Sequence, residues 1–282
     1  MSIKILQGNC LETLSSLEEK SVNTCVTSPP YWGLRDYGTD DQLGLEETPE
    51  KFVENLVNVF REVRRVLRDD GTVWLNLGDS YLSNKQLGGI PWRVAFALQS
   101  DGWYLRQDII WHKPTHMPES VTDRCTKSHE YIFLLSKSPK YYYDNEAIKE
   151  ETLTQDNQNR DRETTKLNNT PGRTKMSGLK TNNYETKNKR SVWSVAPIPY
   201  KEAHFATYPP ELIKPCILAG CPEGGTVLDP FGGSGTTAQV ASNLNRNAIL
   251  CELNPEYVDI AKGRLHDSLG MFLDMTVEIP IN

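Results

Sequence analysis

The chain has 282 residues, of which 31 are Lys or Arg and 37 are Asp or Glu, so its formal charge at pH 7 is −6. This balance excludes a uniformly basic nucleic-acid-binding protein but not a local basic surface, because net charge averages over the whole molecule. The length allows one large or two small domains at roughly 100–200 residues each. No apolar run approaches the ~20 residues that span a bilayer, so no membrane partner is expected. The six cysteines are scattered, which favours reduced thiols in a cytoplasmic protein.

Short apolar runs alternate with helical patterns along most of the chain. Apolar side chains at spacings of three and four predict a first long helix over residues 49–67. Such alternation is typical of an α/β protein, in which helices cover both faces of a mostly parallel sheet. The predicted strands are 3–6, 22–26, 72–77, 104–111, 131–136, 226–228 and 248–251, and the further predicted helices are 90–99, 212–219, 236–244 and 256–265.

Residues 151–190 interrupt this pattern, because only five of these forty side chains are apolar. Such a segment buries too little surface to offset the entropy of ordering it. A loop of this length inside a compact domain is usually functional or disordered. We therefore expect residues 151–190 to be an insertion, with residues 1–150 and 191–282 forming the two parts of one domain.

A proline-rich turn, Ser28-Pro29-Pro30-Tyr31, follows the strand predicted over residues 22–26. The two prolines fix φ and remove two backbone donors, so the carbonyls of the turn lack nearby N–H groups that could compete for them. These acceptors lie at the carboxyl end of a strand, where open α/β sheets bind ligands. Acceptors beside the ring of Tyr31 suit a planar ligand that carries an amino group, although a stiff turn with a core aromatic is the plain alternative.

A glycine-rich turn over residues 229–237 (Asp-Pro-Phe-Gly-Gly-Ser-Gly-Thr-Thr) joins a predicted strand to a helix. Glycines let a ligand approach the backbone, and the first N–H groups of a helix can bind a polar group. Glu252 ends the next strand, 20 residues after Gly232, at the distance where Rossmann-like folds place the acid that binds ribose hydroxyls. Together these features predict a nucleoside-containing cofactor, whereas a glycine turn alone would not. The turn lacks the Lys of a P-loop and the G-x-G-x-x-G spacing, which argues against ATP and NAD.

The two motifs together resemble those of the amino-methylating DNA methyltransferases that use S-adenosylmethionine. The order, catalytic turn first and cofactor loop last, is similar to the β class of that family. The resemblance implies a Rossmann-like, seven-stranded, mostly parallel sheet that is circularly permuted, with the C-terminal strand-loop-helix-strand unit beside the N-terminal strands. Further segments that resemble the family are 71–79, 111–114 (Trp-His-Lys-Pro), 128–131 (Ser-His-Glu-Tyr) and 204–209.

The resemblance also implies roles for individual residues. Ser28 and the Pro29 carbonyl would accept hydrogen bonds from the target amine, Pro30 would complete the turn, and Tyr31 would stack on the flipped base. Glu252 would hold the ribose of the cofactor. Methyl transfer would be direct, and positioning would supply most of the catalysis. The implied cofactor-binding residues are Asn9, Cys10, His204, Phe205, Ala206, Asp229, Pro230, Phe231, Gly232, Gly233, Ser234, Gly235, Thr236, Thr237 and Glu252.

A serine at the first position of the turn resembles the cytosine-N4 members of the family. The resemblance thus implies site-specific methylation of the N4 amine of a cytosine flipped out of double-stranded DNA. The alternatives are an adenine-N6 enzyme, an amino-methyltransferase acting on RNA or protein, and an inactive DNA-binding module. Residues 151–190 would recognise the target, since they carry nine basic and five acidic residues. A homodimer and a cognate restriction endonuclease are further partners that such a resemblance suggests.

Covalent attack at carbon 5 of cytosine would need an activated Cys, usually in a Pro-Cys turn. Pro215-Cys216 lies within the helix predicted over residues 212–219, so we expect Cys216 to pack in the core. The six cysteines include no C-x-x-C pair, and no metal site is expected. The charged loop over residues 112–130 is expected to shape the base pocket, without a role for any one of its side chains.

Overall fold

The computed structural model describes residues 1–34, 36, 38–39, 41–115, 118–152, 185–198, 208–270 and 274–279. The chain divides into two compact units, one formed by Met1–Asp144 with Ser191–Asn282 and the other by Asn145–Arg190. Among the described residues, no helix is both long enough and apolar enough to cross a membrane.

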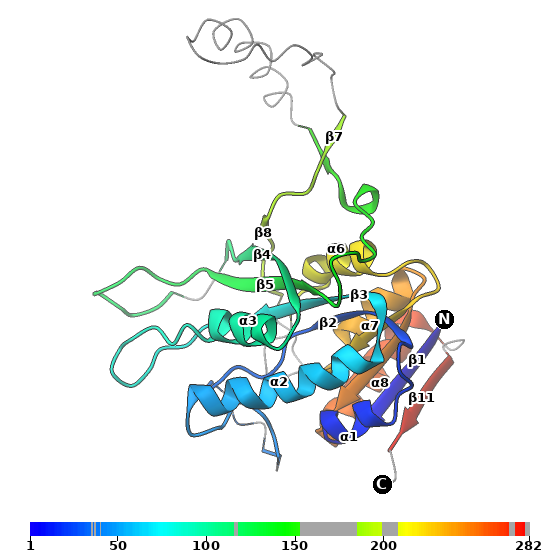
Figure 1. Cartoon of the computed structure of the whole chain (residues 1–282), viewed down its shortest axis with the longest axis horizontal. Helices are drawn as coiled ribbons and strands as arrows, with labels where there is room; N and C mark the ends of the chain where they lie inside the picture. The colour runs from blue at the N-terminus through cyan, green and yellow to red at the C-terminus, as the bar shows by residue number, and fades with distance from the viewer. Residues whose placement is uncertain are drawn as a thin grey trace, which may run out of the picture. The chain divides into compact units, whose positions relative to one another are not determined.

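The first unit contains a sheet to which the described residues contribute nine strands, in the order β11-β1-β10-β9-β2-β3-β5-β4-β8 (Figure 1). All seven predicted strands are present in it, and the mostly parallel α/β fold is confirmed; β8 and β11 extend the sheet at its two edges. The strands are β1 (Ser2–Gln7), β2 (Val22–Thr27), β3 (Leu67–Leu77), β4 (Tyr104–His112), β5 (His129–Ser136), β8 (Val192–Ser194), β9 (Thr226–Asp229), β10 (Asn247–Glu252) and β11 (Asp274–Glu278).

The strand order confirms the expected circular permutation. β10 pairs in parallel with β1, from Ile3 opposite Ala248 to Gln7 opposite Glu252. β9 lies between β10 and β2 and is parallel to both. The C-terminal strands are therefore inserted between N-terminal ones, and the carboxyl ends of β1, β2, β9 and β10 meet at one edge of the sheet.

Helices cover both faces of this sheet. Val73, Leu75 and Leu77 of β3 belong to the buried cluster that also contains the apolar faces of α2 and α3. Trp74 points to the other face, because its indole nitrogen lies near Gly220 of α6. The helices are α1 (Cys10–Ser15), α2 (Pro49–Val66), α3 (Ile90–Ser100), α6 (Pro210–Gly220), α7 (Thr236–Asn243) and α8 (Pro255–Leu269).

The second unit contains η1 (Glu146–Ile148) and the short strands β6 (Glu150–Glu151) and β7 (Thr186–Lys187). The two strands pair antiparallel, and Glu150 forms ion pairs with Arg190 at 2.9 Å and Lys189 at 3.6 Å. Residues 153–184, most of the predicted insertion, lie outside the described residues.

Candidate functional site

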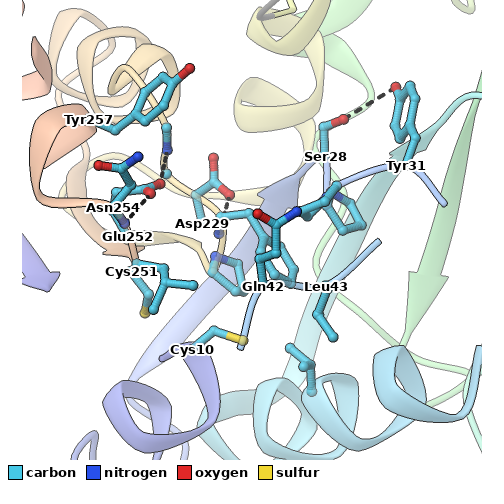
Figure 2. A pocket seen from close by; sticks show the side chains of 18 of the residues that line it. Cys10, Ser28, Tyr31, Gln42, Leu43, Asp229, Cys251, Glu252, Asn254 and Tyr257 are labelled. Atoms are coloured by element: carbon cyan, nitrogen blue, oxygen red, sulfur yellow. Dashed lines mark hydrogen bonds between the residues drawn. The ribbon is translucent and has the colours of Figure 1, made fainter. Parts of the chain in front are cut away.

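A cavity of about 730 Å³ opens where the carboxyl ends of β1, β2, β9 and β10 meet. Its volume is within the range of roughly 300–1,000 Å³ that is usual for small-molecule sites. Figure 2 shows Ser28 and Tyr31 at one end of the cavity and Glu252 and Asn254 at the other. The predicted site residues that line it are Asn9, Cys10, Ser28, Pro29, Pro30, Tyr31, Asp229, Pro230, Phe231, Gly232, Gly233, Thr236 and Glu252.

The structure places three predicted cofactor residues outside this lining. The Ser234 hydroxyl accepts a hydrogen bond from Arg264 of α8 at 3.0 Å, and a Cβ on Gly235 would lie 3.1 Å from Ala261. Thr237 bonds to Asp229. These residues fix the glycine loop against α8 and β9. His204, Phe205 and Ala206 lie outside the described residues.

Asp229 joins the ends of β2 and β9 through its buried carboxylate. One oxygen accepts hydrogen bonds from the Thr27 hydroxyl at 2.6 Å and the Phe231 N–H at 3.1 Å. The other accepts from the hydroxyls of Tyr208 at 2.9 Å and Thr237 at 2.5 Å. Burial raises the pKa of Asp229, and these hydrogen bonds offset only part of that rise. Asp229 therefore fixes the position of the glycine loop relative to the end of β2, where the proline turn begins.

Glu252 closes the opposite end of the cavity. Its carboxylate accepts hydrogen bonds from the N–H groups of Gly233 at 2.7 Å and Asn254 at 2.9 Å. Burial is the main reason why the pKa of Glu252 is raised. A carboxylate oxygen has more than one lone pair, so each can accept a further bond from a ribose hydroxyl.

The glycine loop forms a cradle that a side chain would fill or distort. A Cβ on Gly232 would lie 2.8 Å from the Cβ of Leu250, and Gly233 has a positive φ of 50°. This backbone, the carboxylate of Glu252 and the apolar Phe231 fit a nucleoside-containing cofactor. Burial raises the pKa of Cys10 to about 12, so the thiol is a neutral part of the wall. Asn9 uses its side-chain oxygen to cap α1, accepting from the Leu11 N–H at 2.9 Å.

The other end of the cavity is built around Tyr31. Its ring lies against the backbone after β3, where a Cβ on Gly78 would be 2.5 Å from the ring. Its hydroxyl donates to Glu130 at 2.6 Å and lies 3.2 Å from the side-chain oxygen of Asn76. Ser28 donates to the same hydroxyl at 3.3 Å (Figure 2). The proline turn and the sheet thus fix both polar groups of the motif.

The lining residues that were not among the predicted site residues include Asn76, Trp111, Lys113 and Glu130. Lys113 forms an ion pair with Glu130 and lies over the Trp111 ring, 4.2 Å from its centroid. These residues lie in the segments 71–79, 111–114 and 128–131, which all resembled the family, so a sequence signal existed for each of the three strands involved. The sequence alone could not show that they end in one cavity.

The rest of loop 112–130 is mainly tied to its neighbours. Arg124 pairs with Glu119 at 2.5 Å and lies over the ring of Tyr81 at 4.1 Å. Lys85 pairs with Asp123 at 3.1 Å. Of the charged residues in loop 112–130, Lys113 and Glu130 line the cavity. His116 lies outside the described residues.

Cys216 is 1% exposed within α6, as predicted for a core residue. It does not line the cavity, so the geometry offers it no part in covalent chemistry there. In the described part of the chain, no group of three or more His, Cys, Asp or Glu side chains could hold a metal ion.

A family model described as DNA methylase, for N6 and N4 methyltransferases, matches residues 22–263. The chain is 47% identical to the Type II methyltransferase M.Cfr9I of Citrobacter freundii, across 93% of this chain and 87% of that protein. It is 45% identical to the Type II methyltransferase M.SmaI of Serratia marcescens, across 94% and 91%.

The fold is also found in solved structures. The PvuII DNA methyltransferase, described as cytosine-N4-specific, superposes with a TM-score of 0.71 at 20% identity, covering 94% of this chain and 86% of that one. The protein TTHA0409 of Thermus thermophilus, in complex with S-adenosyl-L-methionine, superposes with a TM-score of 0.66 at 26% identity, covering 99% and 100%.

Proposed function

This chain belongs to the N6/N4 family of DNA methylases, and on that premise we propose that it methylates the N4 amine of a cytosine flipped out of double-stranded DNA. It is a DNA methyltransferase that depends on S-adenosylmethionine, which supplies an electrophilic methyl group when bound. Flipping is required because the amine of a paired base lies inside the stack, beyond the reach of the cavity.

The observation that carries the choice of cytosine N4 is Ser28 at the first position of the proline turn. Ser28 and the Pro29 carbonyl, at the carboxyl end of β2, would accept the N–H bonds of the amine. Tyr31 would stack on the ring, and the proteins that share this fold include a cytosine-N4-specific one. Adenine N6 is the rival product, since the family includes both activities.

At the other end, Glu252 would hold the ribose hydroxyls of the cofactor. The backbone of the glycine loop would make further polar contacts with the cofactor. Phe231 and Cys10 would supply apolar walls. The residues that fix the loop from behind, Asp229 and Ser234 among them, would position it. Residues 1–150 would form the catalytic part and residues 191–282 the cofactor part of one methyltransferase domain.

Residues 151–190 would recognise the target sequence, with basic side chains on phosphates and polar ones on base edges. Relatives bear Type II methyltransferase names, so a cognate restriction endonuclease is the partner that we propose to seek first. A homodimer is to be sought by sedimentation of the purified chain.

The test uses the purified chain, labelled S-adenosylmethionine and duplex DNA of mixed sequence, followed by digestion to nucleosides. The proposal predicts label on N4-methyldeoxycytidine. Label on N6-methyldeoxyadenosine would overturn the choice of base, and DNA without label would overturn the function.

A further inference from the structure

Amine methylation leaves the enzyme with a proton to remove. The nitrogen uses its lone pair for the new N–C bond, while the pair of the breaking S–C bond stays on sulfur. The amine is then cationic until one N–H proton leaves. Ser28 accepts one of these N–H bonds in the proposed function, but a serine hydroxyl is a poor base and needs a second group to take its own proton.

The hydrogen bonds that leave Ser28 lead to a carboxylate. The Ser28 hydroxyl donates to the Tyr31 hydroxyl at 3.3 Å, and the Tyr31 hydroxyl donates to Glu130 at 2.6 Å. Both donors therefore point in one direction, from the base pocket towards Glu130. The first contact is long, as catalytic hydrogen bonds often are before substrate binds.

Glu130 is fixed by groups from the strands around it. Its side chain is 14% exposed and is paired with Lys113, which follows β4. The side-chain amide of Asn76, on β3, donates to Glu130 at 3.2 Å and to the Tyr131 carbonyl at 3.0 Å. Because β5 is antiparallel to β3, its first residues lie at the edge where β2 and β3 end. The sheet thus holds one carboxylate within reach of the proline turn.

We propose that Tyr31 and Glu130 relay the amine proton away from Ser28, an inference that rests on the proposed amine methylation. The N–H proton passes to Ser28 Oγ while the bonding pair stays on nitrogen. The Ser28 proton passes to Tyr31 Oη, and the Tyr31 proton to Glu130 Oε2. Each hydroxyl gains and loses one proton, so Glu130 ends as the neutral acid and returns the proton to solvent after turnover.

The competing account is that the Tyr31 hydroxyl serves only to orient the ring for stacking. Tyr31→Phe separates the two, because it keeps the ring against Gly78 and removes the relay. Glu130→Gln keeps a hydrogen-bonding side chain of the same size and removes the carboxylate that would take up the proton. Tyr141→Phe is the matched control, since it removes a hydroxyl that bonds to Arg106 at 3.2 Å and does not line the cavity.

The measurement is the single-turnover rate constant for methylation of a duplex substrate, with dissociation constants for cofactor and DNA. We expect Tyr31→Phe and Glu130→Gln each to lower the rate about a hundredfold, as for loss of a general base. Both dissociation constants should stay unchanged. The double variant should be no slower than the slower single one, because both break the same path. Tyr141→Phe should match wild type.

Chemical rescue distinguishes the relay from a purely structural role of Glu130, because an added base can replace a proton acceptor but not a structural contact. Sodium formate should raise the rate of Glu130→Ala but not of Tyr31→Phe, with sodium chloride as the salt control. Tyr31→Phe at the wild-type rate, or no formate rescue of Glu130→Ala, would overturn the relay while leaving the proposed function in place. A wild-type chain that methylates no DNA would instead overturn the proposed function, and the relay with it.

Discussion

Gly78 shows how one missing side chain sets the position of the Tyr31 ring. The ring of Tyr31 occupies the space that a Cβ at Gly78 would need, 2.5 Å away. The φ of Gly78 is not positive, so the backbone itself would accept alanine. The glycine is therefore required by the close approach of the ring and not by the turn.

Gly78→Ala should displace Tyr31 and lower the turnover number about a hundredfold, the loss expected when a reacting group is misplaced by ~1 Å. Cofactor affinity, measured by titration calorimetry, should not change. Gly263→Ala is the control, because a Cβ there meets no atom within 4 Å and the site lies within α8. Equal turnover numbers in the two variants would show that the contact with Gly78 does not position the Tyr31 ring.

Glu252→Gln should weaken cofactor binding by about 1.5–3 kcal/mol, the contribution of hydrogen bonds to a charged group. Because burial raises the pKa of Glu252, the wild-type affinity should also fall as the pH drops through that raised value. Titration calorimetry at several pH values measures the effect of the substitution and the effect of pH. If Glu252→Gln binds the cofactor as tightly as wild type, Glu252 does not contact the cofactor.

Asp229 links β9 to β2 and to the start of α7 through hydrogen bonds, and its carboxyl group is buried. Its pKa is raised in the folded chain, so the folded state binds a proton more readily than the unfolded state does. Stability contributed by this group is therefore greatest below its ordinary pKa of 3.8 and declines as the pH rises through the folded value.

Asp229→Asn should remove this dependence. The free energy of unfolding of wild type minus that of the variant should fall as the pH rises from 3.8 through the raised pKa of Asp229, because the native carboxyl ionises over that interval. Urea unfolding at several pH values measures the difference. A difference that increases with pH would mean that the hydrogen bonds from Thr27, Thr237 and Tyr208 outweigh burial.

Which elements the sequence predicted depended on how much each one buries. The seven predicted strands carry apolar runs, whereas β8 has three residues and β11 is mostly exposed at the edge. Likewise α1 has six residues, too short for a helical period to stand out. α2, with six buried residues on one face, was predicted within one residue.

Some residues of the candidate site could be predicted from the sequence and others could not. The proline turn and the glycine loop are contiguous motifs, so both were visible in the sequence, and pairing of β2 with β9 brings them together. Asn76, Lys113 and Glu130 come from three separate strand ends. Only the order β3-β5-β4 places them beside Tyr31, and no local pattern encodes that order.

At the scale of the whole molecule, the charge is unevenly divided along the chain. Residues 151–190 carry a net charge of +4, which leaves −10 for the other 242 residues. The chain on either side of residues 153–184 is joined by a hydrogen bond from the Thr152 N–H to the Glu185 carbonyl at 2.9 Å. An Asn-Gly turn can therefore replace residues 153–184 without stretching the pair of strands.

That replacement should abolish tight DNA binding and flatten its dependence on salt, because phosphate contacts dominate both. Cofactor affinity should survive, since the cavity lies entirely in the first unit. Fluorescence anisotropy with a labelled duplex, at two salt concentrations, measures the loss. Unchanged DNA affinity would show that another part of the chain binds the DNA target.

We propose that this chain places a methyl group on cytosine N4 through Ser28 and Tyr31. The most direct test is to sequence the methylome of a host that lacks its own DNA methyltransferases and expresses either the wild-type chain or Ser28→Ala. We expect N4-methylcytosine at one recurring sequence with the wild type, and a strong reduction with the variant. N6-methyladenine at that sequence, or equal methylation by both chains, would contradict it.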